Sequence, residues 1–220
     1  MYTRAQVLAA LAAISATDVN AAMGPAFSTG PVSDDFFIRE AISTLILRNG
    51  PSGGFSDAIT SLWVGMGTSN GDLIQSIADN WQQKQLDHVL CTATTQEPIY
   101  GDGQADGTKG DKVTIHYKFD GSTGSYTQTV LINGKTASTL STSDGKALGW
   151  GSAVECAEDN CDTVGDHSWT NATIILDVAD PNYINALAKG CGVSGDMSTS
   201  DSGKTWTVTT INIPEYSFPS

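Results

Sequence analysis

The sequence predicts an all-β protein, an antiparallel β-sandwich with a short helix at its N-terminus. Residues 112–119 (KVTIHYKF) and 125–132 (SYTQTVLI) alternate apolar and polar side chains with a period of two, as half-buried strands do. The pair Asn133-Gly134 follows the second run directly and is a strong signal for a β-hairpin with a type I′ turn. Charged residues make up only 16% of the 220 residues and 23 residues are glycine, which suits closely spaced strands and turns.

Further candidate strands follow one another along the chain, separated by Gly, Asn, Asp and Ser. They cover residues 43–48, 58–66, 72–78, 87–94, 135–142, 169–178 and 204–213. Residues 181–190 are interpreted either as a short helix or as an irregular strand. Strands with short turns between them favour an antiparallel sandwich over alternating strands and helices.

The first 33 residues are expected to lie outside the sandwich. Residues 7–14 form an Ala-rich apolar run that fits a helix begun by Thr3. The same run, with Arg4 before it, also fits a short secretory signal. We favour the retained helix, and with it an intracellular location over secretion. The domain assignment is therefore a helix or signal segment and linker at 1–33, followed by the sandwich at 34–220.

The acidic charge of the chain excludes two classes of partner. Lys and Arg total 11 against 24 Asp and Glu, so the net charge is -13. Nucleic acid and anionic membrane surfaces both bind basic proteins, so neither is expected as a partner. A small-molecule substrate is the expected partner, with no cofactor, and the composition does not give the oligomeric state.

The four cysteines are Cys91, Cys156, Cys161 and Cys191, and an even number permits two disulfides. The short spacing of Cys156 and Cys161 would close a small loop, which leaves Cys91 and Cys191 as the second pair. Four reduced thiols are the alternative, and both readings stay open on the sequence. The chain has no CxxC pair and its histidines lack metal-ligand spacing, so no metal site is expected.

One tripeptide matches a modification motif. Asn171-Ala172-Thr173 is a sequon for N-glycosylation, which applies only if the chain is secreted. Such triplets also arise by chance. Asn171 is therefore a candidate glycosylation site that depends on where the chain is located.

Two segments carry a more specific signal. Residues 62–75 (LWVGMGTSNGDLIQ) form a strand, a glycine turn and a second strand that ends in Gln75, and residues 169–178 (WTNATIILDV) form a later strand. Together they resemble the fungal glutamic peptidases, the eqolisin family. The resemblance implies a concanavalin-like sandwich of two bent sheets with a concave cleft. It also implies that a Glu exchanges protons with water while a Gln, here Gln75, binds that water and the oxyanion.

The catalytic Glu of that family is missing from its expected place. By the resemblance it should follow Ala172, but Thr173 stands there, and a hydroxyl cannot act as a general base at ordinary pH. Asp177 shares that strand face but lies about 13 Å further along the strand. These departures decide against ordinary glutamic proteolysis.

Three functions follow as hypotheses. The favoured one is a cofactor-independent, non-proteolytic enzyme that acts on a small apolar molecule in the cleft, of the cyclase or pericyclase type found in fungal secondary-metabolite biosynthesis. One alternative is a secreted acid endopeptidase with an altered active site. The other is a non-catalytic module that binds carbohydrate or another ligand. For the favoured hypothesis, the expected catalytic residues are Gln75 and Thr173, and the expected substrate-binding residues are Trp63, Trp81, Trp169 and Asp177.

Overall fold

The structure is a computed structural model of the chain. It describes residues 22–33, 36–48, 59–80, 88–94, 98–156 and 161–218, and at 88–94 and 98–99 it describes the backbone only. The expected N-terminal helix, the alternative secretory signal and Trp81 lie outside the described residues. Within the described ranges, no helix has the length and apolar character needed to cross a bilayer.

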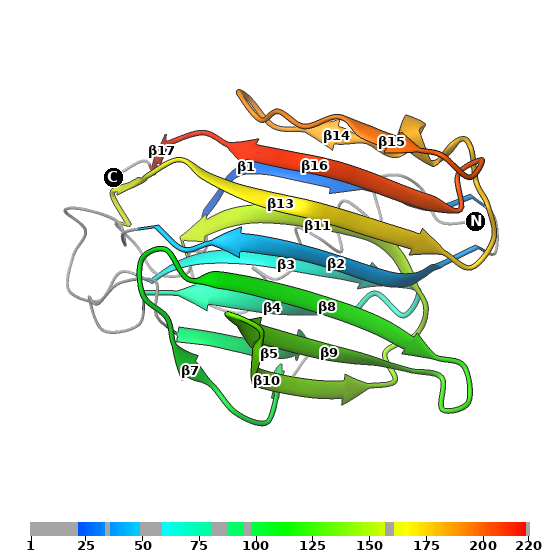
Figure 1. Cartoon of the computed structure of the whole chain (residues 1–220), viewed down its shortest axis with the longest axis horizontal. Coiled ribbons are helices and arrows are strands. Elements are labelled where there is room, and N and C mark those ends of the chain that lie inside the picture. The colour runs from blue at the N-terminus through cyan, green and yellow to red at the C-terminus, as the bar shows by residue number, and fades with distance from the viewer. Residues whose placement is uncertain are drawn as a thin grey trace.

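Two antiparallel sheets pack face to face as a β-sandwich, which confirms the predicted all-β class (Figure 1). In order across the sheet, the strands of sheet A are β14 (Ala188–Lys189), β1 (Ala22–Thr29), β11 (Ala147–Cys156), β3 (Thr60–Thr68), β4 (Leu73–Asp79), β5 (His88–Thr94) and β6 (Pro98–Tyr100), with β7 (Ala105–Asp106) paired to β5. Listed in the opposite direction across the sandwich, so that β10 lies over β5 and β16 over β1, the strands of sheet B are β10 (Lys135–Thr142), β9 (Ser125–Ile132), β8 (Lys112–Asp120), β2 (Ile38–Ile46), β13 (His167–Leu176), β16 (Thr205–Ile213) and β15 (Met197–Thr199). The remaining elements are β12 (Thr163–Val164), β17 (Tyr216–Ser217) and the short 3₁₀ helix η3 (Tyr183–Ala186).

The β8-β9-β10 meander forms as local sequence rules predict. Asn133 and Gly134 have φ angles of 51° and 81°, and type I′ turns need positive φ at both central positions. Alternation along β8 sends Val113, Ile115 and Tyr117 into the core. The Tyr117 hydroxyl donates a hydrogen bond to a backbone carbonyl of β3 at 2.5 Å, so this strand also ties sheet B to sheet A.

The structure corrects the expected boundary of the sandwich. Residues 23–33 were expected to be a linker, but residues 22–29 form β1, which pairs with β11 inside sheet A. The sandwich therefore already includes Ala22. Gly24 and Pro25 mask this strand in the sequence, because both residue types are depleted in strands. The pairing is irregular there, with a register shift between Met23 and Ala26.

A central strand of sheet A also lies outside the expected set. β11 is buried at nearly every position, because one side faces sheet B and the other side is covered as well. A strand buried on both faces shows no polar alternation, so the period-two signal is absent. Two glycines, Gly149 and Gly151, weaken its strand signal further.

Candidate functional site

A patch of buried side chains covers the outer face of sheet A, the face turned away from sheet B. Val64 of β3 and Ile74 of β4 belong to the main core between the sheets. Their neighbours Trp63 and Leu73 belong instead to a second apolar cluster, together with Ala153 of β11. Successive side chains of a strand point to opposite faces, so this second cluster marks the outer face.

Gln75, the residue that carries the resemblance, lies on this outer face beside two glycines. It pairs with Gly65 of β3, and Gly65 pairs in turn with Gly151 of β11. The Gln75 side chain is only 5% exposed, and its Oε1 has no hydrogen-bond partner among the residues that the structure describes. A buried acceptor of this kind needs a donor from outside the described residues, and a bound water is one such donor. Because Gly65 and Gly151 lack side chains, neither can exchange a proton with a water that Gln75 binds.

A buried carboxyl lies further along the same face. Glu155 of β11 pairs with Ser61 of β3, and Ser61 pairs with Asp79 of β4, so the three positions share the outer face. Glu155 is 8% exposed, and burial raises the pKa of its carboxyl. The indole N–H of Trp63 lowers this pKa, but by less than burial raises it. Glu155 therefore keeps its proton to a higher pH than an exposed glutamate and can donate it in mild acid.

Gln75 and Glu155 share a face but are too far apart to hold one water molecule. Their pairing partners Gly65 and Ser61 are four residues apart on β3, which corresponds to about 13 Å along the strand. They also lie on strands two steps apart, which adds about 10 Å across the sheet. Trp63 occupies the position between the two rows. The patch is thus a line of carboxyl, indole and amide rather than a single Glu–Gln centre.

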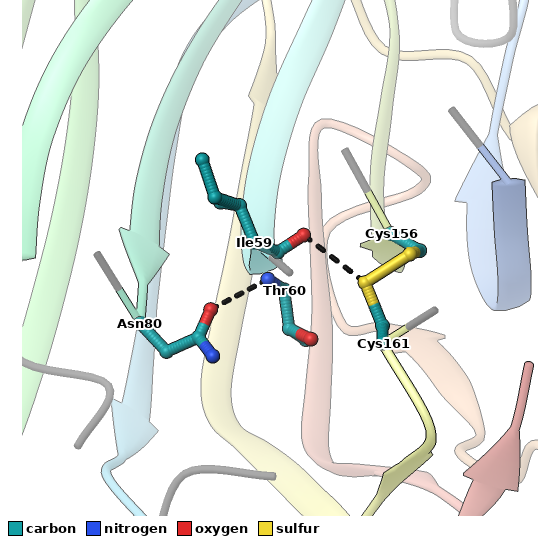
Figure 2. The surroundings of a disulfide bond; sticks show 5 residues. All are labelled: Ile59, Thr60, Asn80, Cys156 and Cys161. Carbon is teal, nitrogen blue, oxygen red and sulfur yellow. Dashed lines mark hydrogen bonds between the residues drawn. A yellow bond between two sulfur atoms is a disulfide. The ribbon is translucent and has the colours of Figure 1, made fainter. Parts of the chain in front are cut away.

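A disulfide holds the strand end that carries the buried glutamate. Cys156 and Cys161 are bonded, which confirms the first candidate pair. Figure 2 shows the Sγ of Cys161 beside the carbonyl oxygen of Ile59, 3.3 Å away. In the same view, the backbone N–H of Thr60 donates to Oδ1 of Asn80 at 2.6 Å. These contacts hold the adjoining ends of β11, β3 and β4 in register next to the carboxyl.

The second candidate disulfide is wrong. Cys191 is a free, exposed cysteine in the segment between β14 and β15 and does not bond to Cys91. Cys91 lies on β5, paired with Ser76 of β4. Over the part of the chain that the structure describes, no group of three or more His, Cys, Asp and Glu residues could hold a metal ion.

The structure does not bring Thr173 to Gln75. Thr173 lies on β13 of sheet B, between Ala172 and Ile174, which both belong to the core. Its side chain therefore points to the outer face of sheet B, whereas Gln75 is on the outer face of sheet A. The thickness of the whole sandwich separates the two residues, so they cannot act in one cleft.

The expected substrate-binding residues are dispersed as well. Trp169 is completely buried in the core between the sheets and is not available to a substrate. Asp177 follows the end of β13, where its Oδ1 accepts the backbone N–H of Phe37 at 2.7 Å. Trp63 alone of these three lies on the outer face of sheet A, and Trp81 is outside the described residues.

A polar pocket lies elsewhere in the molecule. It has a volume of about 440 Å³ and lies beside β14 and β16, where Lys189, Asp196 and Asn212 line it. The Lys189 ammonium donates to the carbonyl of Gly195 at 3.1 Å across this pocket. None of the expected site residues lines it. It is therefore not the apolar cleft that the cyclase hypothesis requires.

The fold can now be compared with known proteins. No protein-family model matches the sequence, and no curated protein matches it at a significant level. The crystal structure of scytalido-glutamic peptidase with a transition state analog inhibitor matches with a TM-score of 0.51. The match covers 87% of this chain and 98% of that chain at 17% sequence identity. The chain has a glutamic-peptidase-like fold.

Other solved structures are also similar to this glutamic-peptidase-like sandwich. SCP-B, a member of the eqolisin family of peptidases in a complex with the tripeptide Ala-Ile-His, is 17% identical with a TM-score of 0.49, covering 87% of this chain and 98% of its own. The galectin LEC-6 of Caenorhabditis elegans is 11% identical with a TM-score of 0.33, covering 60% of this chain and 91% of its own. At identities this low, none of these matches assigns a role to any residue of this chain.

The residue that sequence reasoning missed in this glutamic-peptidase-like sandwich is Glu155. In the sequence it precedes Cys156 and reads only as the edge of a disulfide loop. Its strand lacks alternation, so the sequence does not show which face the side chain takes. The one available signal is a carboxylate in the largely apolar stretch at 153–156 (AVEC), because acidic side chains are rarely buried unless they are paired.

Proposed function

We propose that this protein is an acid-acting hydrolase of chain-like substrates, namely a peptidase with an altered active site. The observation that carries the proposal is the buried, protonatable carboxyl of Glu155 on the same sheet face as the buried amide of Gln75. A buried acid with a raised pKa is suited to general acid catalysis. The glutamic-peptidase-like fold supports peptides as the substrate class, and it does so by analogy.

Two carboxyls divide the proton transfers in this proposal. Asp79 lies in the same row as Glu155, with Ser61 between them, so their Cα atoms are about 10 Å apart. The carboxylate of Asp79 takes a proton from a water whose oxygen attacks the peptide carbonyl carbon. Glu155 gives its proton to the amide nitrogen as the C–N bond breaks, which releases a carboxylic acid and an amine. Paired carboxyls divide acid and base roles in this way in other hydrolases.

In this proposal the substrate is extended and reaches the patch where Glu155 and Gln75 keep exposed fractions of 8% and 5%. From the Glu155 row to the Gln75 row is about 13 Å, the length of roughly four residues of extended chain. The amide of Gln75 can pair with a backbone group of a peptide whose cleaved bond lies at Glu155. The cyclase hypothesis required Gln75 and Thr173 in one cleft, and no observation on the described residues favours it.

Digestion of a peptide library tests the proposal. The wild-type protein is incubated with the library from about pH 3 to about pH 7, and new termini are identified by mass spectrometry. Cleavage is expected in mild acid and should decline as pH rises through the pKa of Glu155. If no new termini form at any pH, the hydrolase proposal is overturned, and the ligand-binding alternative becomes the favoured function.

The substitution Gln75→Ala tests the binding role of the amide. It is expected to raise KM for a peptide substrate about 2- to 10-fold with little change in kcat, since one neutral hydrogen bond contributes about 0.5–1.5 kcal/mol. Steady-state kinetics on a peptide from the library measure both constants. Gln104→Ala, at an exposed position before β7, is the matched control. A fall in kcat at constant KM would instead place Gln75 in the chemical step.

A further inference from the structure

We propose that Asn171 carries an N-linked oligosaccharide. Asn171-Ala172-Thr173 is the only Asn-X-Ser/Thr triplet in the 220 residues. The catalytic proposal uses neither Asn171 nor Thr173, because both lie on sheet B. The inference therefore stands independently of the hydrolase function.

A β-bulge turns Asn171 outward. Trp169 and Ala172 both point into the core although they are three residues apart, where regular alternation would bury residues two apart. The pairing of β13 with β2 shifts its register between Thr170 and Thr173, so the bulge contains one extra residue. Asn171 is that extra residue, and its φ angle is 53°. Its side chain is consequently exposed on the outer face of sheet B.

This geometry leaves room for a glycan. The side chain of Asn171 is exposed, and the ladder of β13 with β16 pairs Thr170 and Ala172, on either side of Asn171, but leaves Asn171 itself out. The neighbouring residue of β16, Thr209, is also exposed. A sugar attached at Asn171 therefore extends into solvent without displacing a core side chain.

The disulfide supports passage through the compartment where the reaction takes place. Disulfides such as Cys156–Cys161 form and persist in secreted chains and are rare in the cytosol. This observation weighs against the intracellular location expected from the sequence. In the secretory pathway the co-reactant is an oligosaccharide linked to a polyisoprenyl diphosphate. The bond from its anomeric carbon to the diphosphate breaks, a bond to Nδ2 of Asn171 forms, and the lipid diphosphate leaves with one amide proton taken up by base.

An alternative reading of Asn171 is purely conformational, and the test separates the two. Asn and Asp both tolerate positive φ better than other side chains, so Asn171→Asp keeps the bulge but removes the amide that accepts the sugar. Thr173→Ala removes the hydroxyl of the sequon, and Thr173→Ser keeps it. These three variants and the wild type are expressed as the full chain in the secretory pathway of a eukaryotic host.

Treatment with peptide-N-glycosidase in ¹⁸O-water gives the readout. The wild type and Thr173→Ser are expected to lose mass and to gain ¹⁸O-labelled Asp at position 171. Asn171→Asp and Thr173→Ala are expected to show neither change, while all four fold and form the Cys156–Cys161 bond. Secreted, disulfide-bonded wild type with unmodified Asn171 would overturn the proposal, and so would an unchanged mass shift in Thr173→Ala.

Discussion

Replacing Glu155 by Gln is expected to slow peptide hydrolysis by about 10²- to 10⁴-fold, the usual contribution of a general acid or base. Glutamine has nearly the same shape as glutamate, but its amide cannot give up a proton and recover it. Because the lost interaction belongs to the transition state, kcat should fall with little change in KM. Steady-state kinetics at the pH of highest wild-type activity measure the effect.

Stability separates this loss of activity from unfolding. Burial raises the pKa of the Glu155 carboxyl above its value in the unfolded chain, so the native state holds this proton to a higher pH, and the residue lowers the free energy of unfolding as pH rises. Gln carries no charge, so Glu155→Gln is expected to be at least as stable as the wild type near pH 7 in thermal unfolding. Glu215→Gln makes the same change at an exposed position and should keep full activity. Equal hydrolysis by Glu155→Gln and the wild type would remove Glu155 from the mechanism.

The protein is expected to lose about 3 kcal/mol of stability between pH 6.5 and pH 4 because of His167. His167 begins β13 and is 1% exposed. Burial lowers its pKa from 6.5 to about 4, and the backbone of Gly165 opposes this shift only in part. Between pH 6.5 and about pH 4, His167 is protonated in the unfolded chain but stays neutral in the native state. The stability present above pH 6.5 is therefore lost as pH falls and the loss is complete below about pH 4.

The variants His167→Gln and His167→Leu test this expectation. Both remove the titrating ring, so the free energy of unfolding should change less between pH 6.5 and pH 4 than in the wild type. Urea unfolding at several pH values measures the slope. The slope is the quantity compared, because either side chain also changes the packing at a buried site. Parallel pH dependence in the wild type and both variants would show that another group is responsible.

The two buried groups set opposing limits on pH. Glu155 must hold its proton to act as an acid, which excludes high pH. His167 weakens the fold as pH falls toward about 4, which excludes strong acid. The protein is therefore expected to be both folded and active over a pH range in mild acid. This range is narrower and less acidic than the composition and the acid-endopeptidase hypothesis suggest.

Part of the candidate site could be predicted from the sequence. The sequence predicts Gln75 as a cleft residue, and the structure places it on the face of sheet A that carries Trp63, where it is 5% exposed; its place in a cleft stays a prediction. The motif around it is local, since residues 62–75 include both of its strands and the turn between them. Thr173 could not be assigned correctly, because the sequence does not show whether its strand joins the sheet of Gln75 or the opposite sheet.

The sequence by itself determined the strands whose signals act between near neighbours. Alternation in β8 and β9 and the turn at Asn133 depend on side chains a few residues apart, and they form as expected. The resemblance of residues 62–75 to one family also determined the expected fold. Only the tertiary structure decided that β11 lies between β1 and β3, which brings Glu155 into line with Ser61 and Asp79. Strand order and register arise from pairing between distant segments, and a strand buried on both faces has no period that reveals its neighbours.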